Sequence, residues 1–152
     1  MKKNKGHFDF TFTKIEKQYK KALDLGYNFI TCKKFADNQN KLKKHTIVNR
    51  IDIDLSVKKA ARLGNIFNRL GIKGTFFIRL HEPKYNPFSF ENYRIIKSLI
   101  KDGHEIGYHS EIIVQGKLWN EDPQFCLLRD IDVINRMFNI KVSGVASHRS
   151  GL

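Results

Sequence analysis

Polar side chains that could bind a metal ion or transfer a proton lie at or just after the ends of four apolar segments. They are Asp52 and Asp54, Arg79 and His81, His109, and His148. Aspartate and neutral histidine are ligands that Zn²⁺ accepts, and a catalytic zinc site keeps one coordination position open. Two carboxylates two residues apart on a strand point to the same side of it. One aspartate of the Asp52/Asp54 pair can therefore bind a metal while the other acts as a base.

Several of these side chains also have a purely structural interpretation. Asp54 precedes Ser56 and an expected helix, and an aspartate there often caps the first helical turn. His148 could be an exposed residue close to the last residue of the sequence. Glu111 could be a site carboxylate or a solvated loop charge, and we favour the latter. His104 follows an expected helix end, so we predict a structural role for it.

The elements that must position the polar side chains alternate between strand and helix. Short β-prone stretches predict strands at 27–31, 45–54, 74–80, 104–110 and 141–147. The segment GTFFIRL (74–80) is almost continuously apolar, which is typical of a strand covered on both faces. The alternation predicts an α/β fold with a mainly parallel sheet and flanking helices. In such folds reactive groups gather at the carboxyl ends of the strands.

Helix start signals stand between the expected strands. The signals are a capping box from Thr13 to Glu16, a helical pattern that runs from Ser56, a cap at Ser89, and Asp122 followed by Pro123. Apolar residues follow each of them at helical spacing, and Gly26, Gly71 and Gly103 supply ends for the first three helices. Residues 32–44 are rich in Lys and Asn, and they favour a short helix and a loop.

Length and composition limit the class of protein. The 152 residues fit one domain, 1–152, and 41% hydrophobic residues suffice for a core. No run of about 18 uncharged apolar residues occurs, so we expect no membrane span. The start of the sequence lacks the apolar run of a secretory signal, and Cys32 and Cys126 lack metal-type spacing. Free thiols without a signal predict a cytoplasmic location.

The chain is strongly basic. Lys and Arg number 28 against 15 Asp and Glu, which gives a formal net charge of +13. Such a charge attracts polyanions in general without selecting one of them. The aromatic residues fall mostly at core-like spacings instead of being interleaved with arginine, so we do not expect a nucleic-acid partner.

Four ordered segments carry a resemblance to a known family. They are RIDID (50–54), LGIKGTFFIRL (70–80), GHEIGYHSE (103–111) and VASHRSG (145–151). The chain resembles the NodB-like polysaccharide deacetylases, a group of carbohydrate esterase family 4 type, and especially the branch whose first motif reads RHDVD. GHEIGYH is the most specific segment, and residues 8–31 are similar to the amino-terminal helix and strand of that branch.

The resemblance implies a partial (β/α) barrel of the polysaccharide deacetylase type and a metal-dependent hydrolase. Such an enzyme removes acetyl groups from an N- or O-acetylated sugar with a divalent metal, here expected to be zinc. By the resemblance, Asp52 would be the catalytic base, with Asp54 and His109 as metal ligands, although the two aspartates could exchange roles. His148 would be a third ligand or the catalytic acid. Arg149 would orient a carboxylate or contact the sugar substrate.

The sequence also departs from the family pattern. Ile113 stands where many members have a second histidine, and Ile51 replaces the histidine of the first motif. The later strands and motifs of the family have no counterpart after Leu152. We therefore expect a missing C-terminal segment or a partner to complete the barrel. Two alternatives remain open: an inactive glycan-binding remnant, and a basic module that binds nucleic acid or another polyanion.

Overall fold

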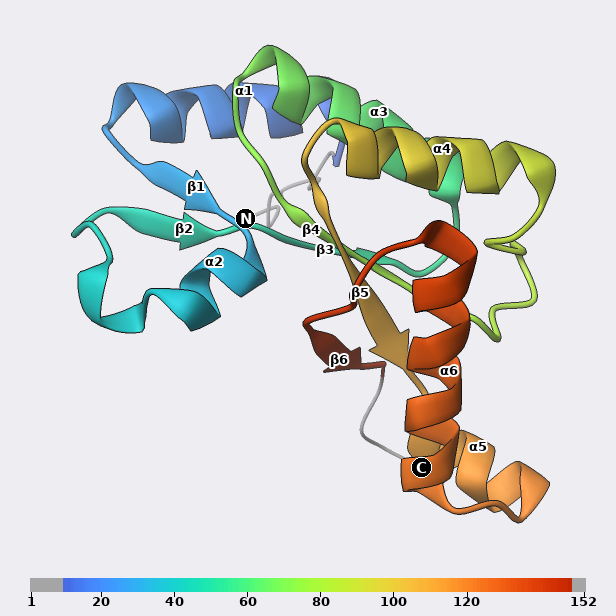
Figure 1. Cartoon of the computed structure of the whole chain (residues 1–152). Coiled ribbons are helices and arrows are strands. Elements are labelled where there is room, and N and C mark those ends of the chain that lie inside the picture. The colour runs from blue at the N-terminus through green and yellow to red at the C-terminus, as the bar shows by residue number, and fades with distance from the viewer. Residues whose placement is uncertain (1–9, 149–152) are drawn as a thin grey trace, which may run out of the picture.

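Helices and strands alternate along residues 10–148, the part of the chain that this computed structural model describes (Figure 1). In chain order they are α1 (Phe12–Asp24), β1 (Asn28–Ile30), α2 (Cys32–Asp37), the 3₁₀ helix η1 (Gln39–Lys41), β2 (Thr46–Val48), β3 (Arg50–Ile53), α3 (Val57–Arg69), β4 (Thr75–Ile78), α4 (Phe90–Lys101), β5 (Glu105–Ser110), α5 (Ile112–Trp119), α6 (Pro123–Phe138) and β6 (Val145–Ser147). None of the described helices is long and apolar enough to cross a membrane.

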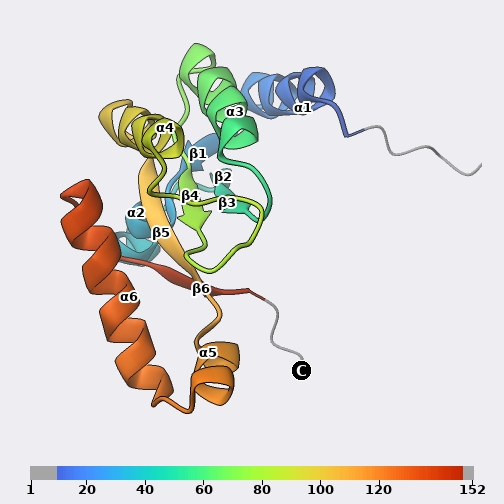
Figure 2. The same cartoon turned by 90° about the vertical axis from the view of Figure 1, so that its right-hand side faces the viewer.

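The main sheet has four parallel strands in the order β3-β4-β5-β6. Each strand of this sheet is followed in the sequence by its neighbour in space. Every connection therefore leads one step across the sheet in the same direction, as in a (β/α) barrel. The sheet curves into a half-barrel, and α3, α4 and α6 lie along its outer side (Figure 2). The expected α/β class with a mainly parallel sheet is confirmed, and the flanking helices are present.

Asn49 joins the main sheet to a separate parallel pair formed by β1 and β2. Its N–H donates to the Ile30 carbonyl at 2.8 Å, and its carbonyl accepts from the Thr75 N–H at 2.9 Å. Its buried side chain accepts from the Tyr19 hydroxyl at 2.7 Å and donates to the Lys73 carbonyl at 3.1 Å. The expected strand 45–54 therefore exists, and at Asn49 it changes its partner from β1 to β4.

Alternation along the strands separates the face covered by helices from the inner face of the half-barrel. Ile53, Phe76, Ile78 and Tyr108 are buried in one core with the apolar faces of α3, α4 and α6. The intervening residues, among them Asp52, Phe77 and His109, point to the inner side of the half-barrel. The strands thus place charged and metal-ligating side chains together on the inner side, while the helices bury the outer side.

Three local expectations were wrong. The helix α1 begins at Phe12, with Thr11 as the cap whose hydroxyl accepts from the Lys14 N–H at 3.3 Å, so Thr13 lies inside the helix. This earlier start places the Phe12 ring under the Arg62 guanidinium, 4.1 Å from it. The strand β6 covers only the last part of 141–147, and α5 occupies a stretch for which the sequence predicted no element.

Candidate metal centre

Asp54, His109 and His148 converge at the carboxyl end of the main sheet. Asp54 Oδ1 lies 3.4 Å from His109 Nε2 and 3.7 Å from His148 Nε2. One ligand atom from each residue lies within 4.8 Å of the other two. Ligands bound tetrahedrally at roughly 2.1 Å from Zn²⁺ lie about 3.4 Å apart, so these separations suit one metal ion. The three ligands predicted from the sequence are brought together.

A bound cation would satisfy the polar atoms of this group better than the contacts among the three side chains do. The Asp54 side chain is 48% exposed as a whole, but its Oδ1 is buried and has no hydrogen-bond partner. A buried carboxylate oxygen without a partner is costly, whereas a bound cation would satisfy it. Asp54 does not cap the next helix, because the Ser56 hydroxyl accepts from the Lys59 N–H at 3.3 Å instead. The capping interpretation of Asp54 is therefore wrong.

Backbone contacts orient His109. The ring is buried, and its Nδ1 lies 2.9 Å from the Ala146 carbonyl oxygen of the neighbouring strand. A carbonyl only accepts, so Nδ1 carries the hydrogen and Nε2 keeps its lone pair directed toward Asp54. This is the tautomer that a metal ligand requires.

Contacts of both its backbone and its ring hold His148 in place. Its N–H donates to the Ser110 carbonyl at 2.8 Å, which continues the ladder between β5 and β6. Its Nδ1 lies 3.1 Å from Glu111 Oε1, and its ring meets the His109 ring edge-on at a centroid distance of 5.0 Å. With a side-chain exposure of 19%, His148 is not a solvated residue.

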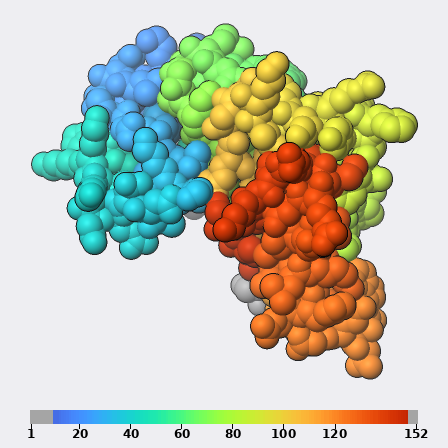
Figure 3. All heavy atoms as spheres, viewed as in Figure 1, coloured from blue at the N-terminus to red at the C-terminus, as the bar shows by residue number. Residues whose placement is uncertain are grey.

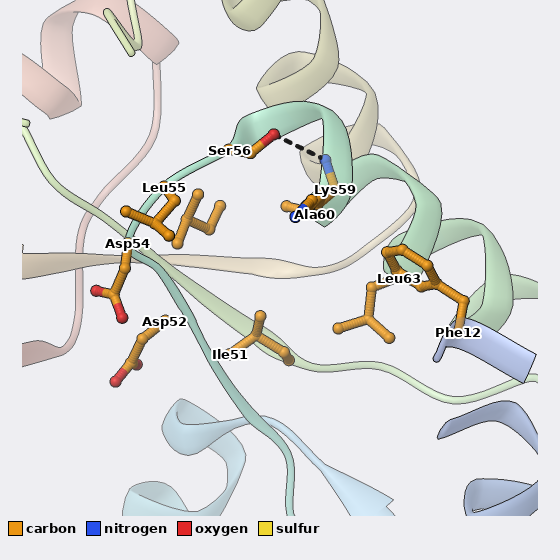
Figure 4. Close-up of a pocket in the computed structure, with 10 residues that line it drawn as sticks. Phe12, Ile51, Asp52, Asp54, Leu55, Ser56, Lys59, Ala60 and Leu63 are labelled. Carbon is orange, nitrogen blue, oxygen red and sulfur yellow. Dashed lines mark hydrogen bonds between the residues drawn. The ribbon is translucent and has the colours of Figure 1, made fainter. Parts of the chain in front are cut away.

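Asp52 lies beside the three ligand residues. Its Oδ2 is 3.6 Å from His109 Nε2. Arg50, which precedes it by two residues on the same side of β3, donates from Nε and Nη2 to its two carboxylate oxygens, each at 2.9 Å. In Figure 4 the carboxylates of Asp52 and Asp54 point to the same side of β3, away from Ile51. The expectation that the two aspartates share one side is met.

A cleft borders the aspartate pair along the free edge of β3. Its volume is about 290 Å³. Asp52 and Asp54 lie at one end, and the far end is closed by Phe12 and Leu63 (Figure 4). The sheet has no strand on this side of β3 within the described residues. The cleft is therefore a mainly apolar surface next to the candidate centre.

Glu111 belongs to the centre, contrary to the expectation of a solvated loop charge. Its side chain is only 17% exposed. Arg79 donates to it from Nη2 at 2.7 Å and from Nε at 3.2 Å, while His148 contacts its Oε1. Arg79 also forms a buried ion pair with Glu82.

Other sequence candidates lie elsewhere. His81, three residues after β4, contacts the buried Asp130 at 3.2 Å and lies edge-on to Trp119, on the helix-covered side. His104 is buried, and its Nδ1 accepts from the Gly74 N–H at 3.3 Å, so its predicted structural role is confirmed. Arg149 lies outside the described residues, so its expected substrate contact stays a prediction.

The sequence reasoning missed Arg50 and the contact between Arg79 and Glu111. Arg50 could have been found from the same two-residue spacing that linked Asp52 to Asp54. The contact between Arg79 and Glu111 carried no such signal, because the two residues are 32 positions apart and follow different strands.

Comparisons of this chain with protein-family models, curated proteins and solved structures find no match.

Proposed function

We propose that this chain is a metal-dependent hydrolase that removes acyl groups, chiefly acetyl, from an N- or O-acylated sugar or polysaccharide, or is a portion of such an enzyme. The convergence of His109 Nε2 and His148 Nε2 on the unpartnered Asp54 Oδ1 carries this proposal. Two histidines and one carboxylate form a donor set that suits Zn²⁺ with one position left open.

Asp54, His109 and His148 would hold the metal. When bound, a divalent metal supplies polarisation of the acyl carbonyl and makes nearby water more acidic. The Ala146 carbonyl keeps the His109 ring in the tautomer that leaves its Nε2 free. In this proposal His148 acts as a ligand, because its Nε2 faces Asp54 Oδ1 at 3.7 Å, and its alternative role of catalytic acid stays a prediction.

Asp52 is the general base of this proposal. Its carboxylate lies next to the ligand cluster without being needed as a fourth ligand. Arg50 fixes both oxygens through two parallel hydrogen bonds, and each carboxylate oxygen can accept a further hydrogen bond. Asp52 thus stays able to accept a proton from the attacking water while its orientation is set.

The sugar as substrate follows from the resemblance of RIDID, LGIKGTFFIRL and GHEIGYHSE to the polysaccharide deacetylases. The partly exposed side chains of Asp52 and Asp54, at 30% and 48%, support access by a substrate to the centre. A general basic charge of +13 adds attraction for anionic glycans without distinguishing them.

We also propose that a further polypeptide segment completes the barrel. Both β3 and β6 are edge strands of the main sheet within residues 10–148, and the apolar cleft beside β3 offers a surface for packing. Unpaired edges of a parallel sheet tend to recruit another strand. A C-terminal continuation or a partner chain would serve equally.

Acetate release tests the activity. The chain is incubated with Zn²⁺ and acetylated chito-oligosaccharides or peptidoglycan fragments, and free acetate is measured enzymatically. We expect release by the wild type and loss in Asp54→Ala and His109→Ala. The matched control is His45→Ala, which removes an exposed histidine that packs on Tyr27. A folded, zinc-loaded wild type that releases no acetate would support the inactive glycan-binding alternative instead.

A further inference from the structure

One polar residue follows each strand of the main sheet directly. Asp54 follows β3, Arg79 follows β4, Glu111 follows β5 and His148 follows β6. These four residues form a connected chain of contacts across the carboxyl end of the sheet. Only Asp54 and His148 are candidate metal ligands, so Arg79 and Glu111 need a separate explanation.

Arg79 holds this series of contacts in place. Its side chain is 9% exposed, and it pairs with Glu82 at 5% exposure and with Glu111 at 17%. Its Nη1 also approaches the Asp54 carbonyl oxygen at 3.4 Å. A charged group this deeply buried is stable only when its hydrogen bonds are satisfied, so the guanidinium holds both carboxylates in place.

The charges of Arg79, Glu82 and Glu111 bear on which ring nitrogen of His148 carries the hydrogen. One guanidinium faces two carboxylates, which leaves an excess negative charge beside the imidazole Nδ1 of His148, 3.1 Å from Glu111 Oε1. A carboxylate accepts hydrogen bonds and favours a hydrogen on Nδ1. Nε2 faces a second carboxylate, but at 3.7 Å from Asp54 Oδ1 it lies beyond hydrogen-bond distance, so the single hydrogen of the neutral ring is better placed on Nδ1.

The two histidines of the centre are therefore fixed by different means. His109 uses the Ala146 carbonyl, which belongs to the backbone, whereas His148 depends on a side chain. A carboxylate behind a ligating histidine fixes the ring and raises its basicity, and loss of such a partner typically lowers metal affinity about 10- to 100-fold.

We propose that Glu111 is the positioning residue of His148, and that Arg79 holds Glu111 in the required orientation. This inference rests on the proposed metal centre. Glu111 touches neither substrate nor metal. Its effect is to keep His148 as the Nδ1–H tautomer, with the ring turned toward Asp54.

Nitrogen NMR of the histidine rings tests the tautomer in the wild-type chain without metal, so this arm needs neither a variant nor activity. We expect His148 to show the Nδ1–H tautomer between pH 7 and 8. A wild-type spectrum with the hydrogen on Nε2 of His148 would overturn the inference.

Zinc affinity measured by competition with a chromophoric chelator gives the second arm. We expect a loss of about 10- to 100-fold in Glu111→Ala. We expect partial recovery in Glu111→Gln, whose amide oxygen still accepts from Nδ1–H. Glu91→Ala is the matched control, because Glu91 is an exposed glutamate that pairs with Lys58. Should Glu111→Ala fail to fold, Glu111→Gln and the wild-type spectrum still decide the question.

The outcomes separate the two proposals. Zinc binding by the wild type that is unchanged in a folded Glu111→Ala overturns the positioning role alone. Absence of zinc binding by the wild type overturns both the positioning role and the metal centre.

Discussion

Arg50 and Asp52 form a two-point ion pair on β3, with Nε and Nη2 each donating to one carboxylate oxygen at 2.9 Å. The pair lies next to the candidate metal centre, where Asp52 Oδ2 is 3.6 Å from His109 Nε2. Planar, two-point contacts fix a carboxylate more firmly than a single lysine contact would. The geometry separates Arg50, which orients the proposed base Asp52, from the residues that would hold the metal.

Asp52→Asn tests this separation. The amide keeps the size of the side chain but cannot accept the proton of the attacking water. We expect acetate release to fall by roughly 10²- to 10⁴-fold while zinc affinity changes little. An equal loss of zinc affinity and turnover would instead make Asp52 a ligand, the exchange of roles that the sequence left open.

Arg50→Lys keeps the charge but removes the two-point contact. We expect a smaller fall in kcat than in Asp52→Asn, with KM and zinc affinity little changed, because only the orientation of the base is lost. The measurement is the steady-state rate of acetate release at saturating zinc. A wild-type kcat in this variant would contradict the orienting role of Arg50.

Gly107→Ala tests the inner wall of the half-barrel. An added Cβ at Gly107 would lie 2.4 Å from the Phe77 ring. The Arg50 guanidinium lies over the same ring, with its carbon 5.2 Å from the ring centroid. We expect the free energy of unfolding to fall by about 1–3 kcal/mol through overpacking, measured by urea denaturation. Gly144→Ala is the control, because its Cβ would meet nothing closer than 3.7 Å. Equal stabilities of the two variants would contradict this packing.

His104 makes the stability depend on pH. Burial, aided by the nearby Lys73 ammonium, lowers its pKa from 6.5 to about 4. Below pH 6.5 the unfolded chain therefore binds a proton that the folded chain refuses, so stability is lost as the pH falls toward 4. The shift corresponds to a loss of roughly 3 kcal/mol.

Urea denaturation of the wild type and His104→Gln at several pH values checks this loss. The glutamine cannot titrate, so the free energy of unfolding of the wild type should fall relative to the variant across this interval. A difference that stays constant from pH 6.5 to 4 would contradict the lowered pKa of His104.

The strand ends could be predicted from the sequence because alternation and apolar runs are local signals. They placed Asp54, His109 and His148 at one edge, where the structure brings them together. Glu111 could not be assigned this way, since its partner Arg79 comes from another strand and its burial depends on the assembled sheet. His81 was a candidate at the same strand ends, but the chain after β4 turns it toward Asp130 on the other side.

Helix boundaries show the same limit. Both Thr11 and Thr13 can cap a helix, and the choice depends on where Phe12 packs against Arg62. The helix α5 has no side-chain cap at Glu111, because that carboxylate is engaged by Arg79 and His148. Because Glu111 contacts residues of the candidate centre instead of capping α5, the sequence carries no capping signal for this helix.

Isothermal titration of the metal-free wild-type chain with Zn²⁺ tests the central claim most directly. The account predicts one zinc ion per chain at micromolar or lower dissociation constant, with binding lost in Asp54→Ala and in His109→Ala and retained in His45→Ala. A wild type that takes up no zinc at micromolar concentrations, or an Asp54→Ala variant that binds as tightly as the wild type, would contradict it.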